Sequence, residues 1–450
     1  MYFYLITFII SILTIPLTWT SLADKKLGIT NIFQVFHRTA SDILTTQGMT
    51  IFSLAFFLYA ILQSQSLQSI FFSQRKWLRK RKYSTIALIT FFAAFLGSNL
   101  SWFDELIHFY PIVIPLFMSM GFDIFSSFLC LYGGSIAGLM GLVSTWRIKQ
   151  YFDQSFGEFK GTFDYSGTSE IVFRLISFLI FTSIIIIFNI WYCSKNKQKL
   201  TEKKNNIVPN QPPLIFNKTR KIILVIATIV LIVSIFSQAA PLGKFLSKYA
   251  EKIPSQISSE WGIFGKWNGV AVDCLFIIGG IVISLLSKQK IMNNLVLSIN
   301  ESVPILLIYV FVAVPTTIIR ETGISEKMIK NLLPTSIDNS FKYIILFSVF
   351  GLSILFSFLF NTVAITTALV TALSPLLFSI SEQFLIFAAI FSWMGGIIGT
   401  TFSPHSGTLV NSLEKVKISY KEFIKKTWIL WLTMLITSFC LVFYQIKKIL

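Results

Sequence analysis

Apolar runs separated by polar connections fill most of this 450-residue chain. Most runs are long enough for an α-helix to cross the hydrocarbon core of a bilayer, which takes about 20 residues. The pattern predicts on the order of eleven full membrane spans plus shorter, broken pieces. The runs comprise residues 2–19, 49–72, 84–103, 106–121, 122–145, 171–193, 222–238, 269–287, 296–319, 341–358, 362–380, 384–402 and 428–445.

The stretch 97–123 interrupts this pattern, because it places polar and acidic residues between apolar runs. Ser98 and Asn99 precede two adjacent acids, Asp104 and Glu105. Acidic side chains are costly in hydrocarbon, so acids beside membrane spans usually face protein or water and mark an ion or substrate path. We interpret the stretch as half of a binding site. The alternative is a loop at the membrane surface that carries two solvated acids.

Two prolines, Pro111 and Pro115, follow the acids. Each removes a backbone donor, so they predict that this segment is not one unbroken helix. Broken backbone at membrane depth is tolerated only where it is buried in protein or lines a cavity. Asp123, which follows the broken piece, is more typical of a helix N-cap than of a ligand contact.

Composition identifies the class of protein. Hydrophobic residues make up 54% of the chain and charged residues 13%, and the mean hydropathy is +0.72. These values indicate a polytopic membrane protein embedded in a lipid bilayer. The formal net charge of +18 would by itself suit a nucleic-acid partner. The basic residues gather in the connections between apolar runs, however, so we expect no nucleic acid.

The distribution of Lys and Arg predicts the orientation, since cytoplasmic loops are enriched in both. One set of connections holds 21 basic residues and three acids, whereas the opposite set holds 15 basic residues among more acids. We therefore expect the first set to be cytoplasmic, in a plasma membrane such as the bacterial inner membrane. The first set is 73–83, 194–221, 287–290 and 403–426, and the second is 20–47, 146–169, 240–266, 320–339 and 446–450.

The order of spans and connections repeats within the chain. Residues 49–193 and 296–445 show the same order but enter the membrane from opposite faces, which is typical of an inverted-topology repeat. We therefore predict an all-α polytopic membrane protein with two inverted-topology repeats, re-entrant hairpins and discontinuous transmembrane helices. The expected parts are a first membrane half, 1–193, a cytoplasmic linker, 194–221, and a second half, 222–450.

Glycine-rich motifs support the repeat. GGSIAGLMGLVST at 133–145 resembles GGIIGTTFSPHSG at 395–407 in glycine spacing and in its polar ending. Such tips suit re-entrant or unwound helices, because glycine permits the dihedrals and the close approach that they need. The alternative is that these glycines only let helices pack closely.

The candidate substrate- and ion-binding residues are polar side chains at these predicted breaks. They are Ser98, Asn99, Asp104, Glu105, Ser144, Thr145, Asp273, Asn361, Thr362, Thr401, Ser403 and Ser406. No metal site and no cofactor are expected; a coupling proton or Na⁺ is left open.

The basic residues bear on the choice of substrate. Outside the connections only Arg174 and Lys342 are basic, and both lie near span ends, where long side chains reach the interface. We therefore expect no buried guanidinium that could bind a substrate carboxylate. A carboxylate would rest on half-helix N-termini and on Ser, Thr and Asn donors. Asp104, Glu105 and Asp273 would meet an amine, a guanidinium, a proton or Na⁺, which favours an amino acid over a dianion.

Several motifs carry a family resemblance. The segment Asp104-Glu105-Leu-Ile-His108-Phe109-Tyr110-Pro111, followed by Gly121-Phe-Asp123, resembles the C4-dicarboxylate anaerobic carrier-like (DcuC/YfcC) family of the ion transporter superfamily. GIIGTTFSPHSGTLVNSLEKVKISYKEFIK, FSFLFNTVAITTALVTALSPLL and VAVDCLFIIGGI are similar to further segments of that family. The resemblance implies a secondary carrier of dicarboxylates, or an exchanger of amino acids such as arginine and ornithine.

The chain also departs from the family pattern. The family's Asn-Pro is absent after Ser144-Thr145, and its Ser-Ser-Ser-Gly set is replaced by Asn361-Thr362-Val363-Ala364. His108 replaces a proline, and the arginine expected within 269–287 is missing. These departures weaken the inference of the family's substrate for this chain more than the inference of its fold.

The sequence thus favours a secondary-active transporter, either an antiporter or an ion-coupled symporter, of a small charged metabolite by alternating access. The expected cargo is an amino acid of the arginine or ornithine type or a C4-dicarboxylate. A membrane enzyme with Asp104 and Glu105 as catalytic acids, or a channel, is the alternative; no HExxH, Ser-His or CxxC pattern supports an enzyme. Homodimer formation is left open.

Overall fold

The computed structural model describes residues 18–19, 26–28, 30–44, 48–74, 77, 80–100, 102–103, 105–141, 143, 168–196, 217–238, 269–322, 339–359, 362, 366, 369–370, 382–404 and 406–449. These residues form helices joined by short turns, and no strand occurs among them. The predicted all-α class is confirmed. Most of the run 2–19 and most of the run 362–380 lie outside the described residues.

The chain divides into two compact units, and each unit combines separate stretches of sequence. Unit 1 contains residues 1–44, 139–181 and 305–450, and unit 2 contains residues 45–138 and 182–304. Each unit therefore draws on both halves of the chain. The predicted half-turn symmetry between 49–193 and 296–445 is a separate property and stays a prediction.

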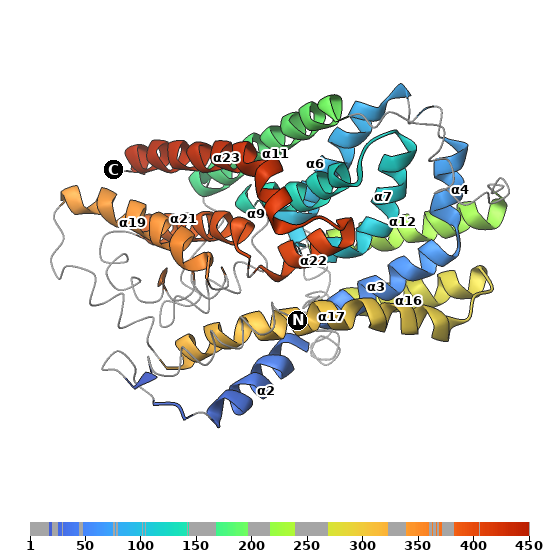
Figure 1. The fold of residues 1–450 in the computed structure, drawn as a ribbon, viewed down its shortest axis with the longest axis horizontal. Helices are drawn as coiled ribbons and strands as arrows, with labels where there is room; N and C mark the ends of the chain where they lie inside the picture. The colour runs from blue at the N-terminus through green and yellow to red at the C-terminus, as the bar shows by residue number, and fades with distance from the viewer. Residues whose placement is uncertain are drawn as a thin grey trace, which may run out of the picture. The chain divides into compact units, whose positions relative to one another are not determined.

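Figure 1 shows the helices of both units. Within unit 2 lie α3 (Met49–Gln63), α4 (Ser66–Ser73), α6 (Lys82–Leu100), the 3₁₀ helix η2 (Glu105–Phe109), α7 (Tyr110–Ser119), α8 (Ile124–Phe128), the π-helix η3 (Leu129–Gly133), α12 (Lys218–Gln238) and α16 (Gly269–Leu286). Within unit 1 lie α2 (Asn31–Ile43), α19 (Asn339–Ser357), α21 (Glu382–Phe402), α22 (Gly407–Val416) and α23 (Tyr420–Ile449). Residues of α9 (Gly134–Gly141), α11 (Thr168–Lys195) and α17 (Ile291–Glu321) belong to both units.

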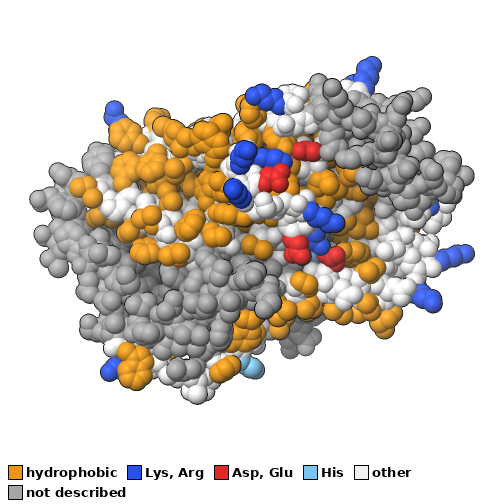
Figure 2. Space-filling model, viewed as in Figure 1, with side chains coloured by type: hydrophobic (Ala, Val, Ile, Leu, Met, Phe, Trp, Pro, Cys, Tyr) orange, Lys and Arg blue, Asp and Glu red, His pale blue; other side chains and the backbone are white. Residues whose placement is uncertain are grey.

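Four helical stretches of the described chain are long and apolar enough to cross a membrane, namely 124–141, 170–195, 383–402 and 420–448. The first and third are 94% buried, whereas the second and fourth are only 39% buried. Large apolar side chains such as Ile187 of α11 and Phe443 of α23 are exposed, and hydrophobic side chains cover much of the described surface in Figure 2. Exposed apolar faces of this kind suit contact with lipid, while α8, α9 and α21 form interior helices.

Two details of the predicted breaks change in the structure. The run 49–72 is not one span, because the chain turns at Gln65, whose φ is 55°, between α3 and α4. Pro115 lies inside α7 without ending it, and Pro111 lies in the first turn of α7, where a helix needs no backbone donor. The break therefore precedes Pro111, between α6 and η2.

Glycines of α9 allow a close approach to α6 within unit 2. A Cβ at Gly134 would lie 2.7 Å from the carbonyl oxygen of Thr90, and a Cβ at Gly138 would lie 2.0 Å from that of Ala94. No larger residue fits at either position unless the helices move apart. Small residues at helix interfaces let backbones approach in this way.

Glycines of α21 make the same contact with α19 within unit 1. A Cβ at Gly395 would lie 2.4 Å from the carbonyl oxygen of Phe350, and a Cβ at Gly399 would lie 2.3 Å from that of Ile354. In both units, two glycines about one turn apart meet two carbonyl groups about one turn apart. These glycines therefore let the helices pack closely, which both interpretations of the motifs expected.

Candidate binding sites in the two units

The break between α6 and η2 buries an acid inside unit 2. Trp102, within the break, is fully buried, and only 2% of Glu105 at the start of η2 is exposed. The alternative of a solvated surface loop therefore does not describe Glu105. Asp104 lies outside the part of the chain that the structure describes.

Ser98 and Asn99 lie in the last turn of α6, just before this break. Ser98 is fully buried, and its backbone nitrogen lies 2.8 Å from the place of a Cβ on Gly138. Asn99 donates from Nδ2 to the carbonyl oxygen of Phe95 at 3.0 Å. The structure thus brings both residues to the break in the same unit as Glu105, and the Asn99 amide is engaged within its own helix.

Asp273 belongs to the same unit and is 5% exposed. Ser53 of α3 donates from Oγ to Asp273 Oδ1 at 3.2 Å. Phe276, one turn further along α16, contacts the Trp102 ring at a centroid distance of 5.9 Å. Because η2 also packs on α3, α3 is the common neighbour of both predicted acidic residues.

Trp102 presents a polar group at this break. Its indole Nε1 is buried and has no hydrogen-bond partner among the described residues. An unpartnered buried donor costs about 1–3 kcal/mol, so such groups in native proteins call for an explanation. At this break Trp102 therefore offers a hydrogen-bond donor.

Glu301 is an acid that the sequence analysis missed. It lies in α17 within unit 2, and its carboxylate is hydrogen-bonded to the hydroxyl of Tyr59 on α3. The signal was available, because Glu301 is the acid inside the apolar run 296–319.

Hydroxyl groups gather at the end of α21 in unit 1. Thr362 donates from Oγ1 to the carbonyl oxygen of Gly396 at 2.9 Å and lies 3.2 Å from Thr400 Oγ1. Ser403 donates from Oγ to the carbonyl oxygen of Phe358 at 2.5 Å. Thr401, also predicted, is buried and bonds back within α21. We call Thr362, Thr400, Thr401 and Ser403 the hydroxyl cluster.

The N-terminus of α22 follows this cluster. Ser406 is its N-cap, and its Oγ accepts from the backbone N–H of Leu409 at 3.4 Å. Two buried groups near these helix ends, Ser357 Oγ and Asn411 Nδ2, have no partner among the described residues. A helix N-terminus together with unpartnered donors suits an anionic group. Asn361, Ser144 and Thr145 lie outside the described residues.

Arg174 corrects one expectation. It does not reach the interface: the side chain is 5% exposed, and Nε donates to the carbonyl oxygen of Glu170 at 3.2 Å. The reason is packing, because Phe173 meets Phe387 and Phe391 of α21 at centroid distances of 5.8 Å. At about 1.5 Å per residue, these two rings lie roughly 14–20 Å along α21 from Thr400 of the hydroxyl cluster. A buried guanidinium thus exists, but away from the predicted donors.

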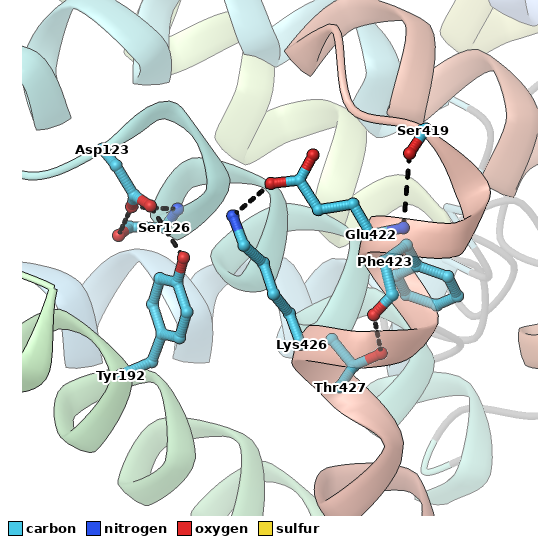
Figure 3. Close-up of polar contacts among 8 residues, drawn as sticks. All are labelled: Asp123, Ser126, Tyr192, Ser419, Glu422, Phe423, Lys426 and Thr427. Atoms are coloured by element: carbon cyan, nitrogen blue, oxygen red, sulfur yellow. Dashed lines mark hydrogen bonds and ion pairs between the residues drawn. The ribbon is translucent and has the colours of Figure 1, made fainter.

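Asp123 confirms its predicted role as an N-cap. Its Oδ1 accepts from the backbone N–H of Ser126 at 3.1 Å, at the start of α8. Tyr192 donates to the other carboxylate oxygen at 2.7 Å, and Figure 3 shows the carboxylate between these two residues. The carboxylate is therefore engaged in holding α8 and α11 together in unit 2.

Figure 3 also shows the first turns of α23, in unit 1. Lys426 and Glu422 form an ion pair at 2.8 Å, and Ser419 Oγ accepts from the backbone N–H of Glu422 at 3.3 Å. Both charged side chains are partly exposed, so the pair contributes little to stability.

The sequence profile of a family described as C4-dicarboxylate anaerobic carrier, DcuC, matches residues 48–447. That range contains every candidate residue named above. No curated protein matches the chain.

Two solved transporter structures are similar to the chain. The YdaH transporter of Alcanivorax borkumensis, described as having an unusual topology, aligns with a TM-score of 0.51 and 15% identity over 99% of this chain and 98% of that one. MtrF of Neisseria gonorrhoeae, described within a class of antimetabolite efflux pumps, aligns with a TM-score of 0.47 and 14% identity over 98% and 94% of the two chains. The likeness to YdaH shows the fold, a polytopic helical one.

Proposed function

The chain belongs to the C4-dicarboxylate anaerobic carrier family, and we propose that it is a secondary-active carrier that moves a small carboxylate metabolite across the membrane by alternating access. C4-dicarboxylates are the first candidate substrates, because the family's description names them. The carrier works either by exchange of two substrates or by symport with a cation.

One observation supports this proposal most directly: each unit has a glycine-packed helix pair that runs into a break with polar side chains. In unit 2 the break carries Glu105, and in unit 1 it carries the hydroxyl cluster and the N-terminus of α22. Discontinuous helices of secondary carriers hold substrates and coupling ions, and half-helix N-termini point at anionic groups. A protein without transport function has no need of two such breaks.

The two breaks suit different charges. The α22 N-terminus, Ser406 and Asn411 offer donors without a carboxylate of their own, which suits a substrate carboxylate. Glu105 and Asp273 in unit 2 suit a cation, either a coupling proton, Na⁺ or a substrate amine.

A basic amino acid of the arginine or ornithine type is the second candidate substrate. The acids of unit 2 favour it, since they match an amine or a guanidinium. Arg174 is buried, but it lies away from the hydroxyl cluster and gives a dianion no guanidinium there. The family's description is what favours C4-dicarboxylates. We therefore place C4-dicarboxylates first.

An enzyme with Asp104 and Glu105 as catalytic acids accounts for fewer observations. Glu105 is buried at a helix break rather than in an exposed loop. A channel does not need a buried acid in one unit and a hydroxyl cluster in the other. The family description and the similar fold both belong to transporters.

The test is counterflow with purified protein in liposomes. Liposomes loaded with unlabelled succinate are expected to take up radiolabelled succinate transiently and saturably, because a carrier exchanges substrate without a net gradient. The same assay is run in parallel with L-arginine as the loaded and labelled substrate. Liposomes without protein are the control. Exchange of arginine alone would move the substrate to the second candidate. Flux that does not saturate and shows no counterflow would indicate a channel and contradict the proposal.

A further inference from the structure

One face of α23 carries basic residues at its first turns and apolar residues along the rest of its length. Side chains that recur every three or four residues lie on the same face of a helix. On α23 this spacing relates a series of side chains that are all exposed. We call them the α23 stripe, and in chain order they are Lys421, Lys425, Trp428, Leu432, Ile436, Phe439 and Phe443.

The opposite face fixes α23 within unit 1. Phe423 is fully buried and Trp431 is 2% exposed, and their rings contact at a centroid distance of 6.4 Å. Trp431 also contacts Phe402, the last residue of α21, at 5.6 Å. In the first turn of α23, Tyr420 donates from its hydroxyl to the carbonyl oxygen of Phe402 at 2.5 Å. Because these contacts hold one face of α23 against α21, the exposed α23 stripe is left on the other face.

The lysines of the stripe are not neutralised by the acid beside them. Glu422 pairs with Lys426 at 2.8 Å, as Figure 3 shows. Within the described part of the chain, neither Lys421 nor Lys425 has an ion-pair partner. Lys417, in the turn before α23, is a further exposed lysine. Their ammonium groups can therefore bind an anion from outside the chain.

The dimensions of the stripe match one phospholipid molecule. At about 1.5 Å per residue, Lys421 and Lys425 lie about 6 Å apart along the helix, so both can contact one headgroup. Trp428 follows about 4.5 Å further on, and tryptophan is enriched where headgroups meet hydrocarbon. From Trp428 the apolar part extends about 16 Å to Phe439, close to the thickness of one leaflet of a hydrocarbon core of about 30 Å.

We propose that the α23 stripe is a binding site for an anionic phospholipid of the bilayer. Lys421 and Lys425 bind the phosphate of the headgroup, Trp428 lies at the level of the glycerol, and an acyl chain packs along Leu432 and the apolar residues that follow. Anionic lipids are found in the cytoplasmic leaflet, and the connection 403–426 is predicted to be cytoplasmic. The site binds a lipid and not the transported substrate, so the inference goes beyond the proposed function.

A second copy of this chain suits the stripe less well. Two copies in one membrane have the same orientation, so a two-fold dimer with stripe against stripe would bring the lysines of both copies to the same depth. Like charges that face each other across an interface are costly. An anionic headgroup instead neutralises the lysines while its acyl chains cover the apolar residues.

The test is fluorescence quenching of Trp428 by brominated lipids. Purified protein is reconstituted into mixtures of dioleoylphosphatidylglycerol and dioleoylphosphatidylcholine, with bromine on the acyl chains of one lipid at a time. The variant Trp428→Phe gives the signal of the other tryptophans, which is subtracted. At low salt we expect the wild type to bind phosphatidylglycerol at this site at least about fivefold more tightly than phosphatidylcholine. In the double variant Lys421→Gln/Lys425→Gln this preference is expected to fall below about twofold, because the acyl chains are the same and only the charge interaction is lost.

The matched control is Lys288→Gln/Lys290→Gln, which removes two exposed lysines at the turn before α17 and is expected to keep the preference. Lys421→Arg/Lys425→Arg retains the charge and is expected to keep it as well. Equal binding of both lipids by the wild type, which needs no variant, would overturn the inference. So would an unchanged preference in Lys421→Gln/Lys425→Gln, or an equal loss in the control. Failure of every brominated lipid to quench Trp428 would also overturn it, because protein would then cover the stripe.

Discussion

The helix pair α6–α9 of unit 2 and the helix pair α19–α21 of unit 1 share a packing device but not a chemistry. In both pairs, glycines about one turn apart lie against backbone carbonyl groups, at Gly134 and Gly138 in one pair and at Gly395 and Gly399 in the other. The broken end beyond the first pair carries a buried carboxylate, and the end beyond the second carries hydroxyl groups.

The comparison shows that different residues determine the distance between the paired helices and the charge of the break that follows them. The glycines fix how near two helices can come, whichever side chains follow. The polar residues at the break then set its charge: carboxylates suit a cation, whereas hydroxyls and a helix N-terminus suit an anion. Two similarly packed helix pairs thus lead to breaks of different chemistry, with a buried carboxylate in unit 2 and hydroxyl groups in unit 1.

The largest effect is expected from breaking the packing. Gly138→Ala and Gly399→Ala add a Cβ at 2.0 Å and 2.3 Å from a carbonyl oxygen, so the helices must separate. Overpacking costs about 1–3 kcal/mol, and we expect both variants to lower the Tm in detergent and to reduce the yield of monodisperse protein.

The matched control for this prediction is Gly351→Ala, since no atom lies within 4 Å of a Cβ at Gly351. Its Tm is expected to stay the same or rise, because alanine favours helices. If only one of the variants Gly138→Ala and Gly399→Ala lowers the Tm, the two helix pairs do not share the same packing, which would contradict this prediction.

A smaller effect is expected from removing the charge of the unit 2 break. Glu105→Gln keeps the size and the hydrogen-bonding capacity but not the charge. We expect the initial rate of succinate transport to fall at least about tenfold, roughly 1.4 kcal/mol, because the role we propose for this carboxylate is to bind the coupling cation. The control is Glu422→Gln, which removes the charge of a partly exposed acid at the start of α23. A wild-type rate with unchanged ion dependence would show that Glu105 has no role in binding.

The smallest effect is expected in the hydroxyl cluster. Thr362→Val keeps the shape of the side chain and removes the hydrogen bond to Gly396 at 2.9 Å. We expect KM for succinate to rise about three- to tenfold, near 1 kcal/mol. The maximal rate should change less, because the proposed role of the hydroxyl cluster is to hold the substrate in the ground state.

Thr433→Val is the matched control for Thr362→Val. Its exposed hydroxyl bonds only to the carbonyl oxygen of Ile429 within α23, so the kinetics are expected to match the wild type. A fall in the maximal rate of Thr362→Val at constant KM would indicate that Thr362 acts in the conformational step. The proposed role of the hydroxyl cluster in substrate binding would then be wrong.

The sequence by itself determined the class of this protein and the acidic break near residue 105. Run length and composition predicted an all-α polytopic protein, since a span needs a long apolar helix whatever its neighbours are. Local chemistry predicted the N-cap at Asp123, because a cap depends on residues a few positions away. The acids at the break likewise predicted a polar site, and Glu105 does lie at a break.

Only the tertiary structure decided which side chains are buried and what they meet. Ser53 and Asp273 are 220 positions apart, and no periodicity in the sequence relates them. Arg174 is buried because α11 packs on α21, although its position near a span end predicted an exposed side chain. The glycines contact carbonyl groups of another helix, and Tyr59 meets Glu301 from α3. The physical reason is common to all four cases: burial and partners follow from contacts between distant segments, whereas local pattern reports only the helix on which a residue lies.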